Sequence, residues 1–351
     1  MNYALRTYMW IVLLSFVSAD VYAERKNANA FIVVEKTAYS KTEKRWRKAH
    51  KDRKETDAAL LAGGNFPVLK LAVYIGPLEG NGLRDNKHRN KRRDTIIAAP
   101  LSTDFAKPVD LIFWFHGLGG FGAHDFENRI LTHLTVPPMT SNNFVVVIPE
   151  MPWSQNTRTP RARQGRAFAK KGDWATFVAS VKRQIVLHLD PGTTVTHVCR
   201  TTNNCALKEG NTILIGHSAG GSTLKALAKS SALNTTPRLT RVVFSDASYG
   251  RWLDSTWRAL KHQPRTELIV LTQKYGKPAK SVKRLFRHSS GASDTIALVV
   301  YKDFSHKDIG DLSLLYAYLD PLDNYTTEYH PYEDDADSYA EDDCAGCWCN
   351  E

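Results

Sequence analysis

The sequence predicts an α/β protein whose sheet is doubly wound and mostly parallel, with helices on both sides. Short runs of apolar and β-branched residues recur from about residue 66 onward, and amphipathic stretches lie between them. These runs are apolar throughout rather than alternating, which indicates strands buried on both faces, as in a parallel sheet covered by helices. The alternation of strand and helix along the chain is typical of a doubly wound sheet.

Apolar runs and apolar spacing locate the individual elements. Strands are expected at residues 66–75, 110–115, 144–148, 212–215, 241–244, 267–271 and 295–301. A helix is predicted to begin at Asp173, which would cap it, because Trp174, Phe177 and Val181 follow at three- and four-residue spacing. Further helices are expected at residues 219–229, 251–261 and 308–319. No internal repeat is visible, which argues against a solenoid or a propeller.

The first 23 residues have the layout of a secretory signal peptide. Arg6 precedes an apolar run at residues 9–17, and Val21 and Ala23 stand three and one residues before a plausible cleavage point. A membrane anchor would need a longer run, of roughly 20 apolar residues. We therefore expect cleavage after Ala23 and a mature protein, beginning at Glu24, that is secreted or periplasmic.

Composition divides the remaining chain into three segments. Residues 24–65 are basic and weakly patterned, so they are expected to form an N-terminal extension rather than a domain. The α/β domain is expected over residues 66–325. Residues 326–351 form an acidic tail that contains cysteines, and its composition favours disorder.

The predicted export determines how the five cysteines are interpreted. Cys199 and Cys205 lie six residues apart in a polar segment, and in an oxidising compartment a disulfide between them is the expected pairing. Cys344, Cys347 and Cys349 crowd the tail. Three thiols without a nearby histidine are an incomplete zinc ligand set, so no metal site is expected there and the pairing of these three stays open.

The charge of the chain bears on its partners. The net charge is +11, although residues 328–351 hold nine acidic residues and neither lysine nor arginine. Such a basic body would attract an anionic envelope polymer or a membrane surface, or it is simply a solvated surface that keeps the protein soluble. The basic runs at residues 41–54 and 84–93 lack the interleaved aromatic residues of a nucleic-acid groove, so no specific nucleic acid is expected.

One motif predicts a nucleophile. Residues 216–220, Gly-His-Ser-Ala-Gly, match the pattern Gly-x-Ser-x-Gly directly after a predicted strand and directly before a predicted helix. A serine on such a sharp turn has strained backbone angles, and the flanking glycines avoid clashes with the packed strand and helix. The hydroxyl of Ser218 would stand at a helix N-terminus, where a developing negative charge is favoured.

With this motif in this context, residues 66–320 resemble the α/β-hydrolase superfamily. After the strand at residues 110–115 comes His116-Gly117-Leu118-Gly119-Gly120, which is similar to the His-Gly loop of lipases and esterases. The resemblance implies an oxyanion hole formed by the backbone N–H groups of Leu118 and Ala219, with Gly119 as a further donor. Such donors contribute about 3–4 kcal/mol each to the stability of a tetrahedral intermediate.

The resemblance also implies a general base and an acid that orients it. The base is expected in the loop after the last strand, where His306 stands. The acid is expected between the serine and the histidine in the chain, and Asp246 follows the strand after the one that bears Ser218. The usual alternative position, after the strand at residues 267–271, has no carboxylate. Asp294 leads into a strand and is expected at the opposite edge of the sheet.

Residues 150–172 form a long connection after a parallel strand, and such connections border active sites. Trp153 and Arg158 are candidates for substrate binding there. A solvated basic loop is an equally good interpretation of the segment.

Three functions are therefore considered. The first is a secreted carboxylic-ester hydrolase, without a cofactor, acting on an acyl ester of a lipid, polymer or cell-envelope glycan. The second is a peptidase or amidase with the same Ser218, His306 and Asp246. The third is a non-catalytic binding module on a hydrolase scaffold, which the presence of all three residues disfavours.

Overall fold

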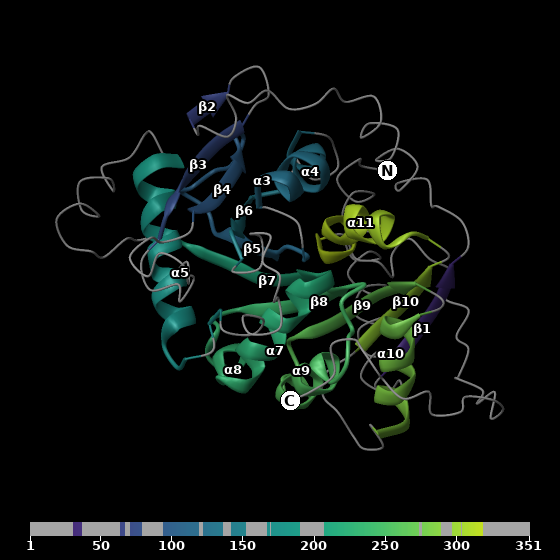
Figure 1. Ribbon diagram of the computed structural model, residues 1–351. Helices are drawn as coiled ribbons and strands as arrows, with labels where there is room; N and C mark the ends of the chain where they lie inside the picture. Colours follow the sequence, from purple (N-terminus) through teal and green to yellow (C-terminus); the bar gives the residue numbers. More distant parts are fainter. Residues whose placement is uncertain are drawn as a thin grey trace, which may run out of the picture.

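The computed structural model describes residues 31–36, 64–66, 71–78, 94–118, 122–135, 142–151, 167–168, 170–189, 207–273, 276–288, 297–302 and 304–318. These ranges fold around one sheet with helices on both of its faces (Figure 1). The predicted signal peptide and the acidic tail lie outside them. Among the described residues, no helix has the length and hydropathy to span a bilayer.

The strands form a single mixed sheet in the order β1-β10-β9-β8-β7-β5-β6-β4-β3-β2. From β1 to β6 in this order the strands run parallel, whereas β4 is antiparallel to both of its neighbours and β2 is antiparallel to β3. The bounds are β1 (Phe31–Lys36), β2 (Gly64–Phe66), β3 (Leu71–Pro77), β4 (Asp94–Pro100), β5 (Val109–Phe115), β6 (Phe144–Pro149), β7 (Glu209–His217), β8 (Leu239–Ser245), β9 (Glu267–Gln273) and β10 (Ala297–Lys302). The predicted fold class, a doubly wound and mostly parallel sheet, is confirmed.

Two layers of helices cover the sheet. Helices α5, α7, α9 and α10 contribute to one apolar core, and η3, α4 and α11 contribute to a second core on the opposite face (Figure 1). The bounds are α3 (Gly122–Asp125), η3 (Phe126–Ile130), α4 (Leu131–Thr135), α5 (Asp173–Gln184), η6 (Ile185–Leu189), η7 (Ser218–Gly220), α7 (Gly221–Lys229), α8 (Ala232–Thr235), α9 (Trp252–Leu260), α10 (Lys277–His288) and α11 (His306–Tyr318). The central strands between these layers are apolar on both faces because both faces are covered.

The structure differs from the sequence-based expectation at the first strands. The strand predicted at residues 66–75 is two antiparallel strands, β2 and β3. Pro67 falls inside the predicted strand, and proline has no N–H to donate to a neighbouring strand. β4 was not predicted, and β1 comes from the segment assigned to the N-terminal extension. The apolar residues of β1 pair in parallel with β10 and extend the sheet by one strand.

The start of α5 also differs in detail. The cap is Gly172, whose φ of 93° is left-handed, rather than Asp173. Glycine adopts this conformation without a steric penalty. Asp173 is the first helical residue, where a carboxylate is favoured by the helix dipole. Helices α3, α4 and α10 were not predicted.

The parallel strands bring several loops to one edge of the sheet. β5, β7, β8, β9 and β10 run in the same direction, so their carboxyl ends meet there. Loops at this edge are where open α/β sheets bind ligands. Ser218 directly follows β7, Asp246 directly follows β8, and His306 begins α11 shortly after β10.

Candidate active site

Ser218 lies on a sharp turn between β7 and α7. Its φ of 52° is left-handed, a conformation that is strained for a residue with a side chain by roughly 1–3 kcal/mol. A Cβ atom at Gly216 would lie 2.9 Å from the carbonyl carbon of Gly220, and one at Gly220 would collide with the carbonyl oxygen of Phe115. Glycine is therefore required at both positions for β7, the turn and β5 to pack this closely.

The loop after β5 lies against this turn. A Cβ atom at Gly117 would lie 3.0 Å from Cβ of Ser218 and 3.5 Å from its Oγ. The side chain of Leu118 is 41% exposed, and Ala219 is buried in the turn. The structure thus brings Gly117, Leu118 and Ala219 to the surroundings of Ser218. Gly119 lies outside the described residues, so its part in an oxyanion hole stays a prediction.

His116 holds the loop after β5 in place. Its buried ring accepts a hydrogen bond at Nε2 from the N–H of Met151, at 2.8 Å. The proton is therefore on Nδ1, which lies 2.9 Å from the carbonyl oxygen of Gly117 and donates to it. The neighbouring Glu150 accepts a hydrogen bond from the N–H of Gly122 at 2.6 Å. These contacts join the loop to the end of β6.

His306 and Asp246 are hydrogen-bonded to each other. Nδ1 of His306 lies 2.5 Å from Oδ2 of Asp246, which is only 1% exposed. The other oxygen, Oδ1, accepts from the hydroxyl of Thr272 at 3.2 Å and from the N–H of Gln273 at 3.3 Å. The end of β9 therefore fixes the carboxylate with one oxygen directed at the imidazole.

Backbone contacts fix where these two residues stand. Asp246 has a left-handed φ of 43°, and its N–H donates to the carbonyl of Leu271 at 2.7 Å. His306 is the first residue of α11, directly after Ser305. The hydroxyl of Ser305 donates to Asp308 at 2.7 Å and accepts from the N–H of Asp308 at 3.2 Å. This reciprocal pair caps the helix and sets the position of His306.

Arg129 ties α11 to the helical segment that follows the loop after β5. Its guanidinium donates to Asp125 at 3.2 Å, to Asp311 at 3.0 Å and to the carbonyl of Lys307 at 3.0 Å. Asp125 also accepts from the indole N–H of Trp114 on β5, at 2.8 Å. The network therefore connects β5 and η3 with the first turn of α11, which bears His306.

His217 lies beneath this first turn. Its ring centroid is 4.6 Å from that of His306, and its Nε2 lies 3.4 Å from the carbonyl oxygen of His306. Burial, followed by the charge of Arg129, holds the pKa of His217 well below its ordinary value, so the ring is neutral. Gly310 makes this packing possible, because a Cβ atom there would lie 2.7 Å from Nε2 of His217.

The two carboxylates beside Arg129 have pKa values shifted in opposite directions. Burial, opposed in part by the charge of Arg129, raises the pKa of Asp311 to about 6. Burial acts on Asp125 too, but the hydrogen bond from His124 and the charge of Arg129 outweigh it and hold the pKa of Asp125 well below its ordinary value. Asp125 is therefore the permanent partner of Arg129, and Asp311 is the titrating one.

Tyr249 is a further residue of the site that the sequence analysis missed. Its phenol lies near the side chain of Ser218, which acts to lower the pKa of the phenol. Burial and the charge of Asp246 raise the pKa of Tyr249 to about 12, so the phenol keeps its proton at neutral pH. The ring packs edge-on against Trp252, with centroids 5.6 Å apart. Its position three residues after Asp246, at the same strand end, is the signal that would have found it.

Other predicted residues cannot be placed. Trp153, Arg158, Cys199 and Cys205 lie outside the described residues. Within the part of the chain that the structure describes, no cluster of three or more His, Cys, Asp or Glu side chains is arranged to hold a metal ion.

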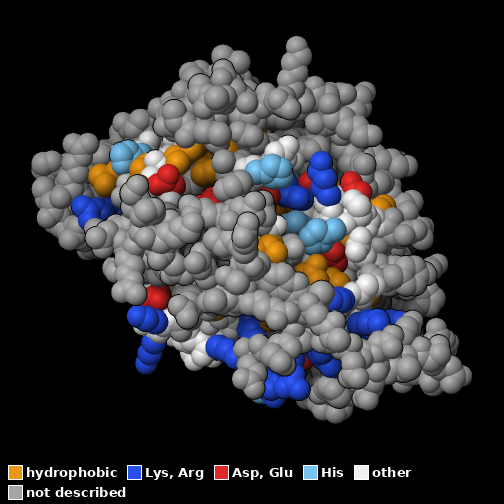
Figure 2. Space-filling view, in the orientation of Figure 1, with side chains coloured by type: hydrophobic (Ala, Val, Ile, Leu, Met, Phe, Trp, Pro, Cys, Tyr) orange, Lys and Arg blue, Asp and Glu red, His pale blue; other side chains and the backbone are white. Residues whose placement is uncertain are grey.

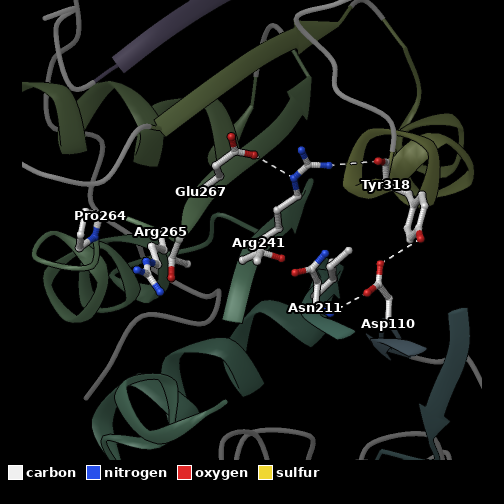
Figure 3. A pocket seen from close by; sticks show the side chains of 10 residues that line it. Asp110, Asn211, Arg241, Pro264, Arg265, Glu267 and Tyr318 are labelled. Carbon is white, nitrogen blue, oxygen red and sulfur yellow. Dashed lines mark hydrogen bonds and ion pairs between the residues drawn. The ribbon is translucent and has the colours of Figure 1, made fainter. Parts of the chain in front are cut away.

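A cavity of about 420 Å³ lies at the opposite edge of the sheet, where the parallel strands begin (Figure 3). Arg241 donates to Glu267 at 2.8 Å and to the carbonyl of Ala317 at 2.9 Å. The hydroxyl of Tyr318 donates to Asp110 at 2.9 Å. These contacts join the end of α11 to β5 and β8, and β8 to β9, which indicates a structural role for Asp110, Arg241, Glu267 and Tyr318 (Figure 3).

The fold and the order of these residues define a class. The α/β-hydrolase fold has a serine on a strand–turn–helix at the centre of a parallel sheet. An aspartate and a histidine follow this serine in the chain and lie at the same edge of the sheet. The resemblance stated from the sequence is thus matched by the sheet order and by the positions of Ser218, Asp246 and His306.

Comparisons with known proteins were made at three levels. No protein-family model and no curated protein sequence matches this chain. Among solved structures the chain is similar to a feruloyl esterase module from Clostridium thermocellum, with 13% identity, coverage of 80% of this chain and 96% of that one, and a TM-score of 0.44. It is also similar to an IroE-like serine hydrolase from Shewanella oneidensis, with 13% identity, coverage of 70% and 78%, and a TM-score of 0.40.

Oligopeptidase B from Trypanosoma brucei is similar as well, with 12% identity, coverage of 73% of this chain and 37% of that one, and a TM-score of 0.40. At such identities and scores, the roles of individual residues rest on the geometry of this chain alone.

Replacing Asp311 by Asn tests the titration of the cluster around Arg129. Because the pKa of Asp311 is raised to about 6, the folded protein retains a proton there that the unfolded chain releases near pH 4. The contribution of Asp311 to the free energy of unfolding is therefore greatest below about pH 4 and falls as the pH rises to about 6. His217 acts in the opposite sense, since its lowered pKa reduces stability as the pH falls through 6.5.

Urea unfolding of the wild type and of Asp311→Asn between pH 4 and pH 7 separates the titration of Asp311 from that of His217, because His217 is present in both proteins. The free energy of unfolding of the wild type, relative to Asp311→Asn, should fall by on the order of 2 kcal/mol across this window. A difference between the two proteins that does not change with pH would show that Asp311 titrates normally.

Proposed function

We propose that the protein is a serine hydrolase that cleaves a carboxylic ester through an acyl-enzyme on Ser218. The observation that carries the proposal is the hydrogen bond of 2.5 Å between Asp246 and His306, at the sheet edge where Ser218 occupies its strained turn. A buried carboxylate that fixes one nitrogen of an imidazole leaves the other nitrogen to act as a base.

The proposed reaction begins with proton transfer. His306 keeps its Nδ1 proton, which is hydrogen-bonded to Asp246, and accepts the hydroxyl proton of Ser218 at Nε2. At the same time Oγ of Ser218 attacks the ester carbonyl. The N–H groups of Leu118 and Ala219 stabilise the resulting oxyanion. The imidazolium then gives its proton to the leaving alkoxide, and an alcohol departs. Water, deprotonated by His306, then attacks the acyl-enzyme; the bond to Oγ of Ser218 breaks, His306 returns the proton to Oγ, and the acid is released.

Several contacts described above support the assigned roles. The carboxylate of Asp246 is held by Thr272 and Gln273, so it cannot turn away from the imidazole. The loop at Gly117 packs directly against Ser218, where an oxyanion would form. A non-catalytic module would need none of this preorganisation. The amidase alternative uses the same residues, and the substrate test below separates it from an esterase.

Covalent labelling of Ser218 tests the proposal. A fluorophosphonate probe should label the wild-type protein and not Ser218→Ala, whereas Ser230→Ala, altered at the end of the same helix, should label normally. p-Nitrophenyl acyl esters should be turned over, whereas peptide anilides should show no turnover above that of Ser218→Ala. An unlabelled wild type, or equal labelling of Ser218→Ala, would show that the protein is not a serine hydrolase; anilide turnover that depends on Ser218 would favour the amidase.

Asp246→Asn should lower kcat for an ester by about 10⁴-fold while the protein stays folded, because an amide favours the wrong tautomer of His306. The matched control is Asp254→Asn, which removes one charge from another buried carboxylate, paired with Arg284. The control should retain kcat within a few-fold. Steady-state kinetics with circular dichroism on the three proteins measures both effects, and equal losses in both variants would contradict the role of Asp246.

We also propose that the protein is exported with cleavage after Ala23 and that Cys199 and Cys205 form a disulfide. The signal-peptide layout and the spacing of the two cysteines support this. Intact-mass analysis of the exported protein should give an N-terminus at Glu24. Peptide mapping without reduction should join the segments that contain Cys199 and Cys205. An intact N-terminus, or free thiols at both cysteines, would refute the corresponding part.

A further inference from the structure

Basic residues dominate the helices on one face of the sheet. Helices α7, α9 and α10 contain eight lysine and arginine residues and a single acidic residue, Asp254, which is paired with Arg284. Positive charge therefore predominates on these three helices.

The basic side chains gather on adjacent helices. Helix α9 packs against both α7 and α10. Figure 2 shows lysine and arginine side chains collected where Figure 1 places α9 and α10. We call the side chains of these helices and their ends the basic face; its exposed members include Lys229, Arg251, Arg258, Lys277 and Lys280.

Cations on this face lie close enough to repel one another. Burial first, and then the charges of Lys229 and Arg251, lower the pKa of Lys225 on α7. Lys225, Lys229 and Arg251 therefore form one cluster although they come from two helices. Repulsion of this kind is relieved when an anion binds between the cations.

The basic face begins at the rim of the candidate active site. Arg251 follows Tyr249 by two residues, and the next residue, Trp252, packs against the start of α7: a Cβ atom at Gly221, three residues after Ser218, would lie 3.2 Å from the Trp252 ring. The intervening Gly250 is held by α10, because its carbonyl accepts hydrogen bonds from Ser281, at 3.2 Å, and from Arg284. A chain bound along α9 would thus continue to Ser218.

The character of the face favours a flexible polymer over a membrane or a nucleic acid. In the described part of the chain, the large hydrophobic residues that are exposed are Leu101 and Leu118, and neither lies on α7, α9 or α10. Among the side chains that the structure describes, the face therefore offers no exposed large apolar group for insertion into a bilayer. Of the tryptophans on α9, Trp257 is buried and Trp252 is half-buried against Tyr249, so neither offers an open surface for stacking a base.

We propose that the basic face binds an anionic polymer, with phosphate or carboxylate groups along its length, whose acyl esters are the substrate of Ser218. This inference rests on the proposed hydrolase function and names its substrate class. The polymer would hold successive anionic groups against α7, α9 and α10 and present an ester-bearing hydroxyl at the end of the face near Arg251. Binding would strengthen with the number of anionic groups contacted and weaken with salt.

Binding to labelled polymers tests the face directly. Fluorescence anisotropy of the full-length mature protein is measured with polygalacturonate, for carboxylate groups, and with inorganic polyphosphate, for phosphate groups. At least one should bind, and the double variant Lys229→Glu/Arg251→Glu should bind it about tenfold or more weakly. The matched control Lys208→Glu/Arg265→Glu reverses two exposed charges at the other edge of the sheet and should bind within about threefold of wild type.

A kinetic measurement ties the face to the site. We compare kcat/KM for an acylated polymer, either O-acetylated polygalacturonate or its phosphate-polymer counterpart, with kcat/KM for p-nitrophenyl acetate. The ratio of the first to the second should fall about tenfold or more in the double variant and stay near the wild-type value in the control. An unchanged ratio in the double variant would overturn the proposal that the bound polymer carries the substrate.

The remaining outcomes are also decisive. Failure of both polymers to bind, equal weakening in the variant and the control, or tighter binding of anionic vesicles or single-stranded DNA would each overturn the proposed face. The proposed hydrolase function fails separately: a protein that binds the polymer but resists fluorophosphonate labelling retains an anion-binding face and loses its assigned reaction. Labelling at Ser218 without polymer binding would support the hydrolase function and overturn the proposed face.

Discussion

The close approach of backbone segments at the turn after β7 is the constraint on which the site depends. Glycine at position 220 lets the turn touch the carbonyl of Phe115, and glycine at position 221 lets α7 touch Ala247. The turn is thereby clamped between the ends of β5 and β8. Those same ends carry Gly117 and Asp246, so a single set of steric contacts fixes the positions of Ser218, the loop beside it and Asp246.

A different kind of interaction positions His306. His306 belongs to the helical layer on the other face of the sheet, and its position depends on two contacts. Ser305 caps α11, and the buried guanidinium of Arg129 donates hydrogen bonds to the carbonyl of Lys307 and to Asp311. Removing one partner from a buried ionic network typically costs about 3–5 kcal/mol. This cost is at least as large as the backbone strain at Ser218, which is roughly 1–3 kcal/mol. The turn and the ion network thus stabilise the same site from two faces of the sheet.

Much of this arrangement could be predicted because it is local in sequence. A strand buried on both faces is an apolar run, and a residue at its carboxyl end follows it directly, which is why Ser218 and Asp246 could be found. Arg129 could not, since it contacts Lys307 across 178 residues and leaves no periodic pattern. β1 was overlooked because its partner β10 is remote in the chain, and β2 and β3 were merged because apolar residues surround Pro67.

The pairing of β1 with β10 has a consequence for how the chain matures. Phe31 is synthesised early, and its partner Ala297 is made near the end of the chain. Non-local pairing of this kind closes slowly. In the proposed exported protein, the nascent β1 would remain an open edge while nearly the whole chain crosses the membrane. β1 ends in Lys36, and a lysine in an edge strand is the kind of charge that keeps such an edge from recruiting strands of other chains.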